Sequence, residues 1–259
     1  MRKLEMSNEV VAAAPMFRDC VCLHGFVDAI CTASMGDIWA HERGDAAVAW
    51  LDFTFLGGDA GSPGATDAIA FLEDLAETPL VKSHGGVRVV CPTEEWEQLL
   101  LSHYGDRVVT REREAFSFGN GKQHEAYLRD VPEDFELVQV PPEDVEAMAE
   151  NLDHALTWNF SVEDFKARGV AFGLRHQGQY VAAASSASIS PNKLEFEVQT
   201  SPNFEGRGFA TIVSAKLIQH CVQAGLEPCW DAANPASGAV AKKLGFASLG
   251  KYQCYKLLS

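Results

Sequence analysis

Hydrophobic and polar positions follow two different periods along the chain, and each period predicts an element type. Lys193–Thr200 (KLEFEVQT) alternates at every second residue, which is typical of a half-buried strand. Ala46–Leu56 is a continuous apolar run that fits a buried strand, whereas residues 19–33 and 65–77 have helical apolar spacing. The same reading predicts further strands at 86–91, 107–118, 135–140, 170–175, 180–189 and 228–232, and a strand or hairpin at 246–257. It predicts helices at 93–103, 142–152, 208–224 and 236–244.

A polar, turn-prone stretch near the middle of the chain predicts a domain boundary. Residues 119–134 begin with GNGKQH, and a strand followed by PPED comes after them. Proline and acids suit the first turn of a helix. A second helix is expected after Ser161, because S-V-E-D places Ser161 as N-cap and Asp164 at the third helical position. The sequence therefore predicts an α/β domain at 1–125 and a second domain at 126–259.

Composition and charge narrow the classes of function. The chain has 259 residues, of which 47% are hydrophobic and 22% charged, enough for two soluble domains with cores of their own. Its formal net charge of −15 argues against a nucleic-acid partner and is compatible with a cationic small molecule. No apolar run is long enough to span a bilayer, so no membrane partner is expected.

The cysteines predict a reducing compartment. There are seven, at irregular spacings and mostly in apolar surroundings, which favours buried thiols over disulfides. On a helix, Cys22 would point away from Cys20 and His24, so no metal site is expected. The N-terminus has no apolar core of the kind a secretory signal needs. We therefore expect a cytoplasmic protein.

One segment carries a candidate anion site. A strand ends at Thr200, a turn contains Gly206 and Gly208, and a helix starts at once. Glycines let the backbone approach a pyrophosphate closely, and the N–H groups of the first helical turn point at it. Alone, this pattern is weakly specific.

Two motifs in this region resemble those of the GNAT superfamily. Residues 205–210 (EGRGFA) are similar to the motif A pattern [Q/R]-x-x-G-x-[G/A], with matches at Gly208 and Ala210 and a departure at Glu205. Asn234-Pro-Ala-Ser237, followed by Gly245-Phe246, resembles the motif B pattern N-x-x-[AS]-x(7)-G-F. The W-D-x-x-N wording at Trp230–Asn234 is similar to one subgroup, which includes zwittermicin-type resistance acetyltransferases.

The resemblance implies a fold and a co-substrate. It implies a GNAT acyl-CoA N-acyltransferase fold with a mixed central sheet in the C-terminal half, preceded by a smaller α/β domain that could be a degenerate GNAT-like lobe. It also implies acetyl-CoA as co-substrate, with no metal. The positions that match the CoA-binding motifs are Val198, Gln199, Thr200, Glu205, Gly206, Arg207, Gly208, Phe209, Ala210, Thr211, Asn234 and Ser237.

The resemblance further implies transfer of an acetyl group to a primary amine of a small molecule. Glu195 and Glu197 lie two apart on one strand and share a face, so either is a candidate general base; equally, both could face solvent. The usual tyrosine position of motif B falls at Ala241, which leaves Tyr252 and Tyr255 as candidate acids. Trp158 and Phe160 are candidates for walls of the acceptor pocket.

Two alternatives remain open at this stage. The missing tyrosine and Glu205 are compatible with a non-catalytic, regulatory CoA-binding module. A two-lobed chain would also suit a GNAT-like aminoacyl- or long-chain acyltransferase. The sequence leaves room for a homodimer and does not name the acceptor.

Overall fold

The chain folds into two compact units. The computed structural model describes residues 1–119 and 121–258. Unit 1 contains residues 1–113 and 251–259, and unit 2 contains residues 114–250. The chain passes from one unit to the other inside two long strands, β6 (Val108–Phe118) and β12 (Phe246–Leu257). The expected single boundary at residue 125 differs from this division, since that position lies inside α7 (His124–Tyr127) of unit 2.

Unit 1 is built on a mixed sheet with the strand order β1-β2-β3-β4-β5-β12-β6. The pairs β1–β2, β2–β3, β3–β4 and β5–β12 are antiparallel, and β4 and β5 are parallel. The remaining strands of this unit are β1 (Arg2–Lys3), β2 (Asp37–Ala40), β3 (Ala46–Trp50), β4 (Thr54–Gly58) and β5 (Val87–Val90), and the helices are α1 (Ser7–Ala13), η1 (Ala14–Phe17), α2 (His24–Cys31), α3 (Pro63–Ala70), α4 (Leu72–Ala76), α5 (Pro79–Ser83), α6 (Glu94–Tyr104) and η2 (Gly105–Arg107).

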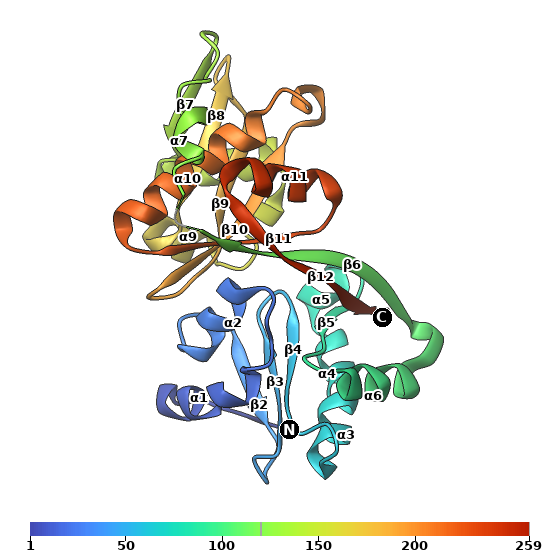
Figure 1. Ribbon diagram of the computed structural model, residues 1–259. Coiled ribbons are helices and arrows are strands. Elements are labelled where there is room, and N and C mark those ends of the chain that lie inside the picture. Colours follow the sequence, from blue (N-terminus) through green and yellow to red (C-terminus); the bar gives the residue numbers. More distant parts are fainter. Residues whose placement is uncertain (120, 259) are drawn as a thin grey trace. The chain divides into compact units, whose positions relative to one another are not determined.

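Helices cover both faces of this sheet (Figure 1). On one face, α3, α4 and α6 enclose a core that includes Ile69, Leu72 and Trp96 together with Leu257 of β12. On the other face, α2 packs against β3 and η1 against β4. The C-terminal strand is therefore part of the core of unit 1.

Two predictions in this half were wrong in detail. The apolar run 46–56 is two strands, β3 and β4, joined by a tight reversal in which the Leu51 N–H donates to the Phe53 carbonyl at 3.1 Å. The helical pattern over 19–33 forms a helix over residues 24–31 alone, because the segment before it contains Leu23 in a left-handed conformation with φ +50°. An α/β unit is nevertheless what the pattern predicted.

Unit 2 also has a mixed sheet, in the order β6-β11-β10-β9-β8-β7. Strands β10 and β11 are parallel, and the pairs β6–β11, β9–β10, β8–β9 and β7–β8 are antiparallel. The elements besides β6, α7 and β12 are β7 (Phe135–Gln139), η3 (Pro142–Asp144), α8 (Val145–Asn151), η4 (His154–Leu156), α9 (Val162–Arg168), β8 (Ala171–His176), β9 (Gln179–Ile189), β10 (Lys193–Thr200), η5 (Pro202–Phe204), α10 (Phe209–Ala224), β11 (Glu227–Ala232) and α11 (Pro235–Leu244).

The two faces of this second sheet carry different helices (Figure 1). The long helix α10 packs on one face through Val213 and Leu217, and α11 adds Ala241 and Leu244 to the same side. Helices α8 and α9 cover the other face, where Met148 and Phe165 are buried among residues of β8 and β9. The mixed α/β class predicted from the sequence is confirmed.

Further features concern cysteines, metals and membranes. The seven cysteines are free thiols, five of them buried. Within residues 1–119 and 121–258 no cluster of three His, Cys, Asp or Glu side chains suits a metal ion. None of the helices in that part of the chain is long and apolar enough to cross a membrane.

Candidate functional site

The two parallel strands of unit 2 separate along their length. β10 pairs with β11 from Lys193 to Glu195, and the pairing ends at Glu195 opposite Cys229, although both strands continue. On its other side β10 stays paired with β9 as far as Thr200. Successive N–H groups of a strand point to alternate edges. Alternate backbone groups of residues 196–200 therefore face the gap between the strands instead of a neighbouring strand.

The turn after β10 leads directly into the N-terminus of α10. Gly206 and Gly208 have φ +73° and +83°, a left-handed conformation that favours glycine. Gly208 is the N-cap, and the first helical N–H groups have no partner within the helix. No hydrogen bond joins the N–H groups of Gly206, Arg207 or Gly208 to any residue the structure describes. This turn therefore presents a set of backbone donors at the positive end of a helix dipole.

A second helix N-terminus lies across the gap. Asn234 is the N-cap of α11, and its Oδ1 accepts the Ser237 N–H at 2.9 Å. The Ser237 hydroxyl accepts the indole N–H of Trp230 at 3.1 Å. These two hydrogen bonds hold the end of β11 and the start of α11 together. Trp230 is buried against Phe196 and Phe246, which fixes its position.

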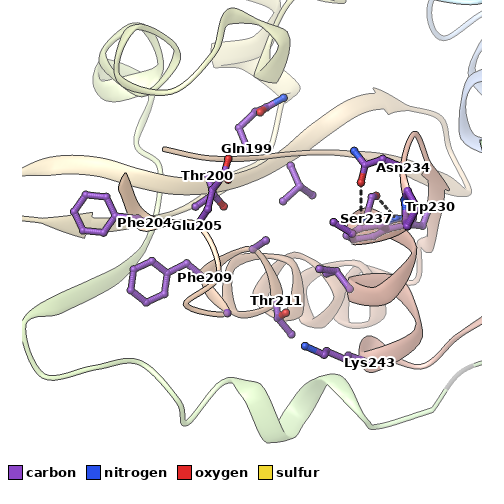
Figure 2. A pocket seen from close by; sticks show the side chains of 17 residues that line it. Gln199, Thr200, Phe204, Glu205, Phe209, Thr211, Trp230, Asn234, Ser237 and Lys243 are labelled. Carbon is purple, nitrogen blue, oxygen red and sulfur yellow. Dashed lines mark hydrogen bonds between the residues drawn. The ribbon is translucent and has the colours of Figure 1, made fainter. Parts of the chain in front are cut away.

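These elements line one cavity of about 680 Å³ (Figure 2). This volume lies within the range of small-molecule and cofactor sites. The cavity wall includes eleven of the twelve positions that the resemblance assigned to CoA binding: Val198, Gln199, Thr200, Glu205, Gly206, Gly208, Phe209, Ala210, Thr211, Asn234 and Ser237. The twelfth, Arg207, is exposed, does not line the cavity, and lies over the Phe204 ring at 5.1 Å.

The wall also contains residues that sequence reasoning missed. They are Phe204, Trp230, Pro235, Ala236, Val240 and Lys243. Ala236, Val240 and Lys243 follow Asn234 at helical spacing, so a helix with its N-terminus at the site predicts them on one face. This helical spacing was the sequence signal that could have identified these three residues as part of the site. Lys243 adds a positively charged side chain to a cavity wall that already contains two helix N-termini.

Glu195 and Glu197 lie on the face of β10 away from α10. Glu197 is opposite Ser185 in β9, and directly opposed side chains share a face. The Ser185 hydroxyl donates to the Leu156 carbonyl of η4 at 2.6 Å, so η4 covers this face. Close by, the Asn159 amide donates to the Ala187 carbonyl at 3.1 Å.

The two carboxylates have different surroundings. Glu195 is 2% exposed and lies where β10 is still paired on both sides. The pKa of the Cys229 thiol opposite it is raised, mainly because the thiol is buried and also because of the charge of Glu195. Glu197 is half-buried and accepts a hydrogen bond from the Gln199 amide at 2.8 Å. Gln199 itself lines the cavity. Glu197 is therefore the carboxylate connected to the cavity by a direct hydrogen bond.

The other candidate residues are not among those lining this cavity. Trp158 and Phe160 are half-buried between η4 and α9, and Phe160 packs edge-on against Phe165. Tyr252 is half-buried in the part of β12 that belongs to unit 1. Ala241 is fully buried in the core next to α10.

Comparison with known proteins identifies the family. The family model described as GNAT acetyltransferase matches residues 16–255. The chain belongs to the GNAT acetyltransferase family. Among curated proteins, it is 28% identical over 207 residues to the uncharacterized N-acetyltransferase YdfB of Bacillus subtilis, covering 78% of this chain and 76% of that protein.

Solved structures agree with this assignment. A GCN5-related N-acetyltransferase-like protein from Streptococcus suis is 26% identical, with a TM-score of 0.78 over 97% of this chain and 99% of that chain. A GCN5-related N-acetyltransferase from Sphaerobacter thermophilus shares the fold at 11% identity, with a TM-score of 0.62 over 100% and 96% of the two chains. The protein is an N-acetyltransferase. The family match includes most of unit 1, whereas the sequence motifs were confined to the C-terminal half.

Proposed function

We propose that the cavity of unit 2 binds acetyl-CoA and that the enzyme transfers the acetyl group to a primary amine of a small molecule. The observation that carries this proposal is that the N-termini of α10 and α11 and the gap between β10 and β11 line one cavity. In this arrangement the pyrophosphate accepts hydrogen bonds from the turn at Gly206–Gly208. The pantetheine arm lies along the open edge of β10.

The chemistry of the cavity suits a polyanionic ligand with an extended arm. Helix N-termini stabilise phosphate through free N–H groups and the helix dipole. Lys243 adds positive charge to the wall. Glu205 is exposed, which allows its carboxylate to turn to solvent while its backbone stays at the turn.

Transfer requires that the amine loses a proton and that the thioester carbonyl is polarised. We assign Glu197 as the general base, acting directly or through water, because it is half-buried and bonded to a cavity residue. A backbone N–H in residues 196–200 would donate to the carbonyl oxygen as the tetrahedral intermediate forms. The nitrogen–carbonyl bond forms, the carbon–sulfur bond breaks, and the CoA thiolate leaves. Tyr252 is the candidate donor of a proton to that thiolate.

The proposal also includes the chemistry of the acceptor, the subgroup of the family and the cellular location. The net charge of −15 supports a cationic amine acceptor. Trp158 and Phe160 remain candidates for its binding, since the segment that carries them covers the same face as Glu197. The W-D-x-x-N wording supports the zwittermicin-type subgroup, and the free thiols support a cytoplasmic protein.

Acetyl-CoA binding is tested by filling the cavity. Ala210 lines the cavity in the first turn of α10, and Ala224 is exposed at the other end of the same helix. Isothermal titration should show that Ala210→Trp weakens acetyl-CoA binding at least about a hundredfold, because the indole occupies the pyrophosphate position. Ala224→Trp is the matched control and should bind as the wild type does. Equal affinity of Ala210→Trp and wild type would place the ligand elsewhere.

Catalysis is tested by release of free thiol from acetyl-CoA across a panel of small amines. Glu197→Gln should lower kcat by roughly 10² to 10⁴-fold while acetyl-CoA affinity is retained, since a general base contributes about that much. Glu195→Gln is the comparison and should have a smaller effect. Acetyl-CoA binding without thiol release for any amine would favour a protein acceptor or a regulatory CoA-binding role. Tyr252→Phe should lower kcat if its hydroxyl is the acid.

A further inference from the structure

A hydroxyl group in the cavity wall of unit 2 is oriented by an indole. The Trp230 Nε1–H donates to Ser237 Oγ at 3.1 Å, and both residues line the cavity (Figure 2). An indole N–H can only donate, so Ser237 is the acceptor in this bond. The hydroxyl has one proton of its own, which is therefore directed to a different acceptor.

Within the described part of the chain, the proton of the Ser237 hydroxyl has no acceptor. A serine in a helix often donates to the carbonyl three or four residues earlier. That bond does not form here, and the Asn234 carbonyl accepts the Gly238 N–H at 3.1 Å instead. Ser237 is half-buried and lines the cavity, so its unused donor is available to a ligand there.

The indole that orients this hydroxyl is itself fixed by packing. Trp230 is 5% exposed, and its ring centre lies 5.8 Å from that of Phe196 and 5.7 Å from that of Phe246. A hydroxyl that accepts a hydrogen bond also donates more strongly, because hydrogen bonds in a chain polarise one another. Trp230 therefore both positions and polarises the Ser237 hydroxyl.

Trp230 lies at the inner end of the gap between β10 and β11. The last pair of these two strands is Glu195 with Cys229, so Trp230 is the first β11 residue beyond it. The glycine turn follows the other end of β10, after Thr200. Four residues of a strand span about 13 Å. An arm that starts at the glycine turn and follows β10 therefore brings its far end toward Trp230 and Ser237.

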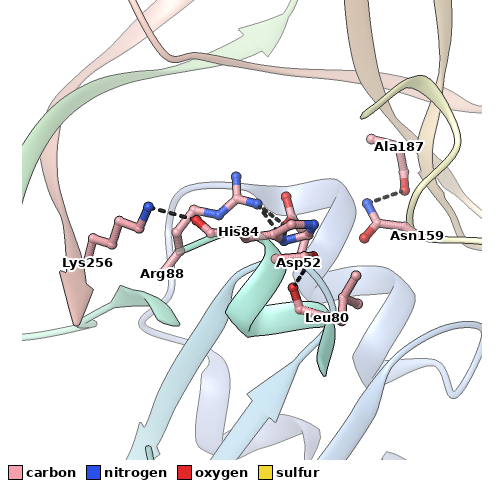
Figure 3. Close-up of polar contacts among 8 residues, drawn as sticks. Asp52, Leu80, His84, Arg88, Asn159, Ala187 and Lys256 are labelled. Atoms are coloured by element: carbon pink, nitrogen blue, oxygen red, sulfur yellow. Dashed lines mark hydrogen bonds and ion pairs between the residues drawn. The ribbon is translucent and has the colours of Figure 1, made fainter. Parts of the chain in front are cut away.

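The candidate base acts from the opposite face of the sheet. Glu197 lies on the face that η4 covers, where the Asn159 amide donates to the Ala187 carbonyl at 3.1 Å (Figure 3). Helix α11, which carries Ser237, packs beside α10 on the other face. An amine can therefore lose its proton on one face while the sulfur leaves toward the other.

We propose that the Ser237 hydroxyl donates a hydrogen bond to the sulfur of CoA and stabilises the thiolate as it leaves, with Trp230 as the positioning residue. This inference rests on the proposed function. The amine nitrogen bonds to the carbonyl carbon, the carbon–sulfur bond breaks and its electron pair goes to sulfur. The amine proton goes to Glu197, and Tyr252 or water protonates the thiolate afterwards. Ser237 keeps its own proton, because an alkyl hydroxyl is a much weaker acid than a thiol.

The test is isothermal titration of the full chain with CoA and with acetyl-CoA at pH 7 and pH 9.5. An ordinary thiol ionises with a pKa of about 8.5, whereas the thioester of acetyl-CoA has no such proton. A donor to the thiolate lowers the pKa of the bound thiol, so CoA affinity rises with pH between the pKa values of the bound and the free thiol. The ratio of CoA affinity to acetyl-CoA affinity should rise about fivefold over this interval.

Charged groups near the site act on both ligands. Glu205 and Lys243 line the cavity, Glu197 is hydrogen-bonded to a cavity residue, and Glu114 pairs with Lys242 of α11 at 3.0 Å. Acetyl-CoA shares every group of CoA except the free thiol. Its titration at the same two pH values therefore corrects for these neighbours.

The variants separate the hydroxyl from the shape of the site. Ser237→Ala should abolish the rise in the affinity ratio and keep acetyl-CoA affinity, and Ser237→Thr should retain the rise because it retains a hydroxyl. Trp230→Phe keeps an aromatic ring without the N–H and should reduce the rise. With an amine that the wild type acetylates, Ser237→Ala should lower kcat about tenfold or more at unchanged KM for acetyl-CoA, since a hydrogen bond to a charged group is lost. Ser102→Ala, at an exposed serine of α6, is the matched control and should behave as the wild type does.

The outcomes distinguish this inference from the proposed function. An equal pH dependence of CoA and acetyl-CoA binding in the wild type would overturn the inference and leave the proposed function standing. Loss of the rise in Ser237→Thr, or an equal loss of affinity for both ligands in Ser237→Ala, would also overturn it, because packing would then decide. Acetyl-CoA binding shows in addition that each variant is folded. Failure of the wild type to bind acetyl-CoA would overturn the proposed function and this inference with it.

Discussion

At the scale of single residues, burial decides the chemistry of the cysteines. Burial raises the pKa of the Cys20 and Cys221 thiols to about 12 and that of the half-buried Cys31 to about 11. The thiolate is the reactive form, so at pH 8 a thiol with a pKa of 12 has a thiolate fraction of only ~10⁻⁴. These thiols therefore serve as small apolar groups and not as nucleophiles.

Native protein should therefore react slowly with a thiol-specific disulfide reagent at pH 8, and all seven cysteines should react after unfolding in guanidinium. Of the three thiols named above, Cys31 should react first, because its pKa is raised least and it is the more exposed. Absorbance of the released chromophore measures the rate, with glutathione as the control. A rapid reaction of Cys20 or Cys221 in native protein would contradict the burial of these groups.

At the scale of elements, the N-terminus of α11 combines capping with a place in the cavity wall. Asn234 Oδ1 caps the helix, and the same residue lines the cavity. Aspartate caps a helix as well as asparagine does, but its negative charge would repel a phosphate ligand. The two functions of the residue can therefore be separated by substitution.

Asn234→Ala should lower the free energy of unfolding by about 1 kcal/mol, the usual value of an N-cap, and should weaken acetyl-CoA binding. Asn234→Asp should keep the stability and still weaken binding, by about tenfold. Urea denaturation and isothermal titration with acetyl-CoA measure the two effects. If Asn234→Asp binds acetyl-CoA as the wild type does, Asn234 serves only the helix.

Elements with a local signal were predictable from the sequence. The alternation of 193–200 is confirmed as β10, and Ser161 caps α9 by accepting the Asp164 N–H at 3.1 Å. The reversal between β3 and β4 was missed because residues 51–53 contain neither glycine nor proline. Its polar residue, Asp52, is buried and accepts a hydrogen bond from Arg88. No turn signal was therefore visible in the pattern.

For the candidate site as well, the features that are local in sequence were predictable and the others were not. The glycine turn and the Asn234 cap are local in sequence, so motif spacing located them, and the structure places both in one cavity. The separation of β10 from β11 and the hydrogen bond from Gln199 to Glu197 depend on strand register and on side-chain positions. The register of β5 and β12 places Arg88 opposite Lys256, although the two residues are far apart in the chain. No local pattern encodes the separation of the two strands or the register that places Arg88 opposite Lys256, because pairing across the fold sets them.

At the scale of the whole molecule, the C-terminal strand completes unit 1. Residues of β12 pair with β5, and Leu257 is fully buried in the core that α3, α4 and α6 enclose. Its neighbour Leu258 is 39% exposed. Cutting the chain near residue 125 would therefore remove a core strand from unit 1.

Leu257→Ala should lower the free energy of unfolding by about 2–5 kcal/mol, since it leaves a cavity in the core of unit 1. Leu258→Ala, one residue further on, is the matched control and should change stability by less than about 0.5 kcal/mol. Urea unfolding followed by tryptophan fluorescence measures both, because Trp96 lies in the same core as Leu257. Equal effects of the two substitutions would show that β12 adds little to unit 1.

The position of β12 in unit 1 has a consequence for synthesis on the ribosome. The first 113 residues leave the ribosome early, but the strand that pairs with β5 is made only after all of unit 2. At 5–20 residues per second, roughly 10–30 s pass between β5 and β12. During that time one edge of β5 has no strand to pair with, and open edges promote aggregation. We therefore expect the nascent chain to be most prone to aggregation in the interval before β12 is made.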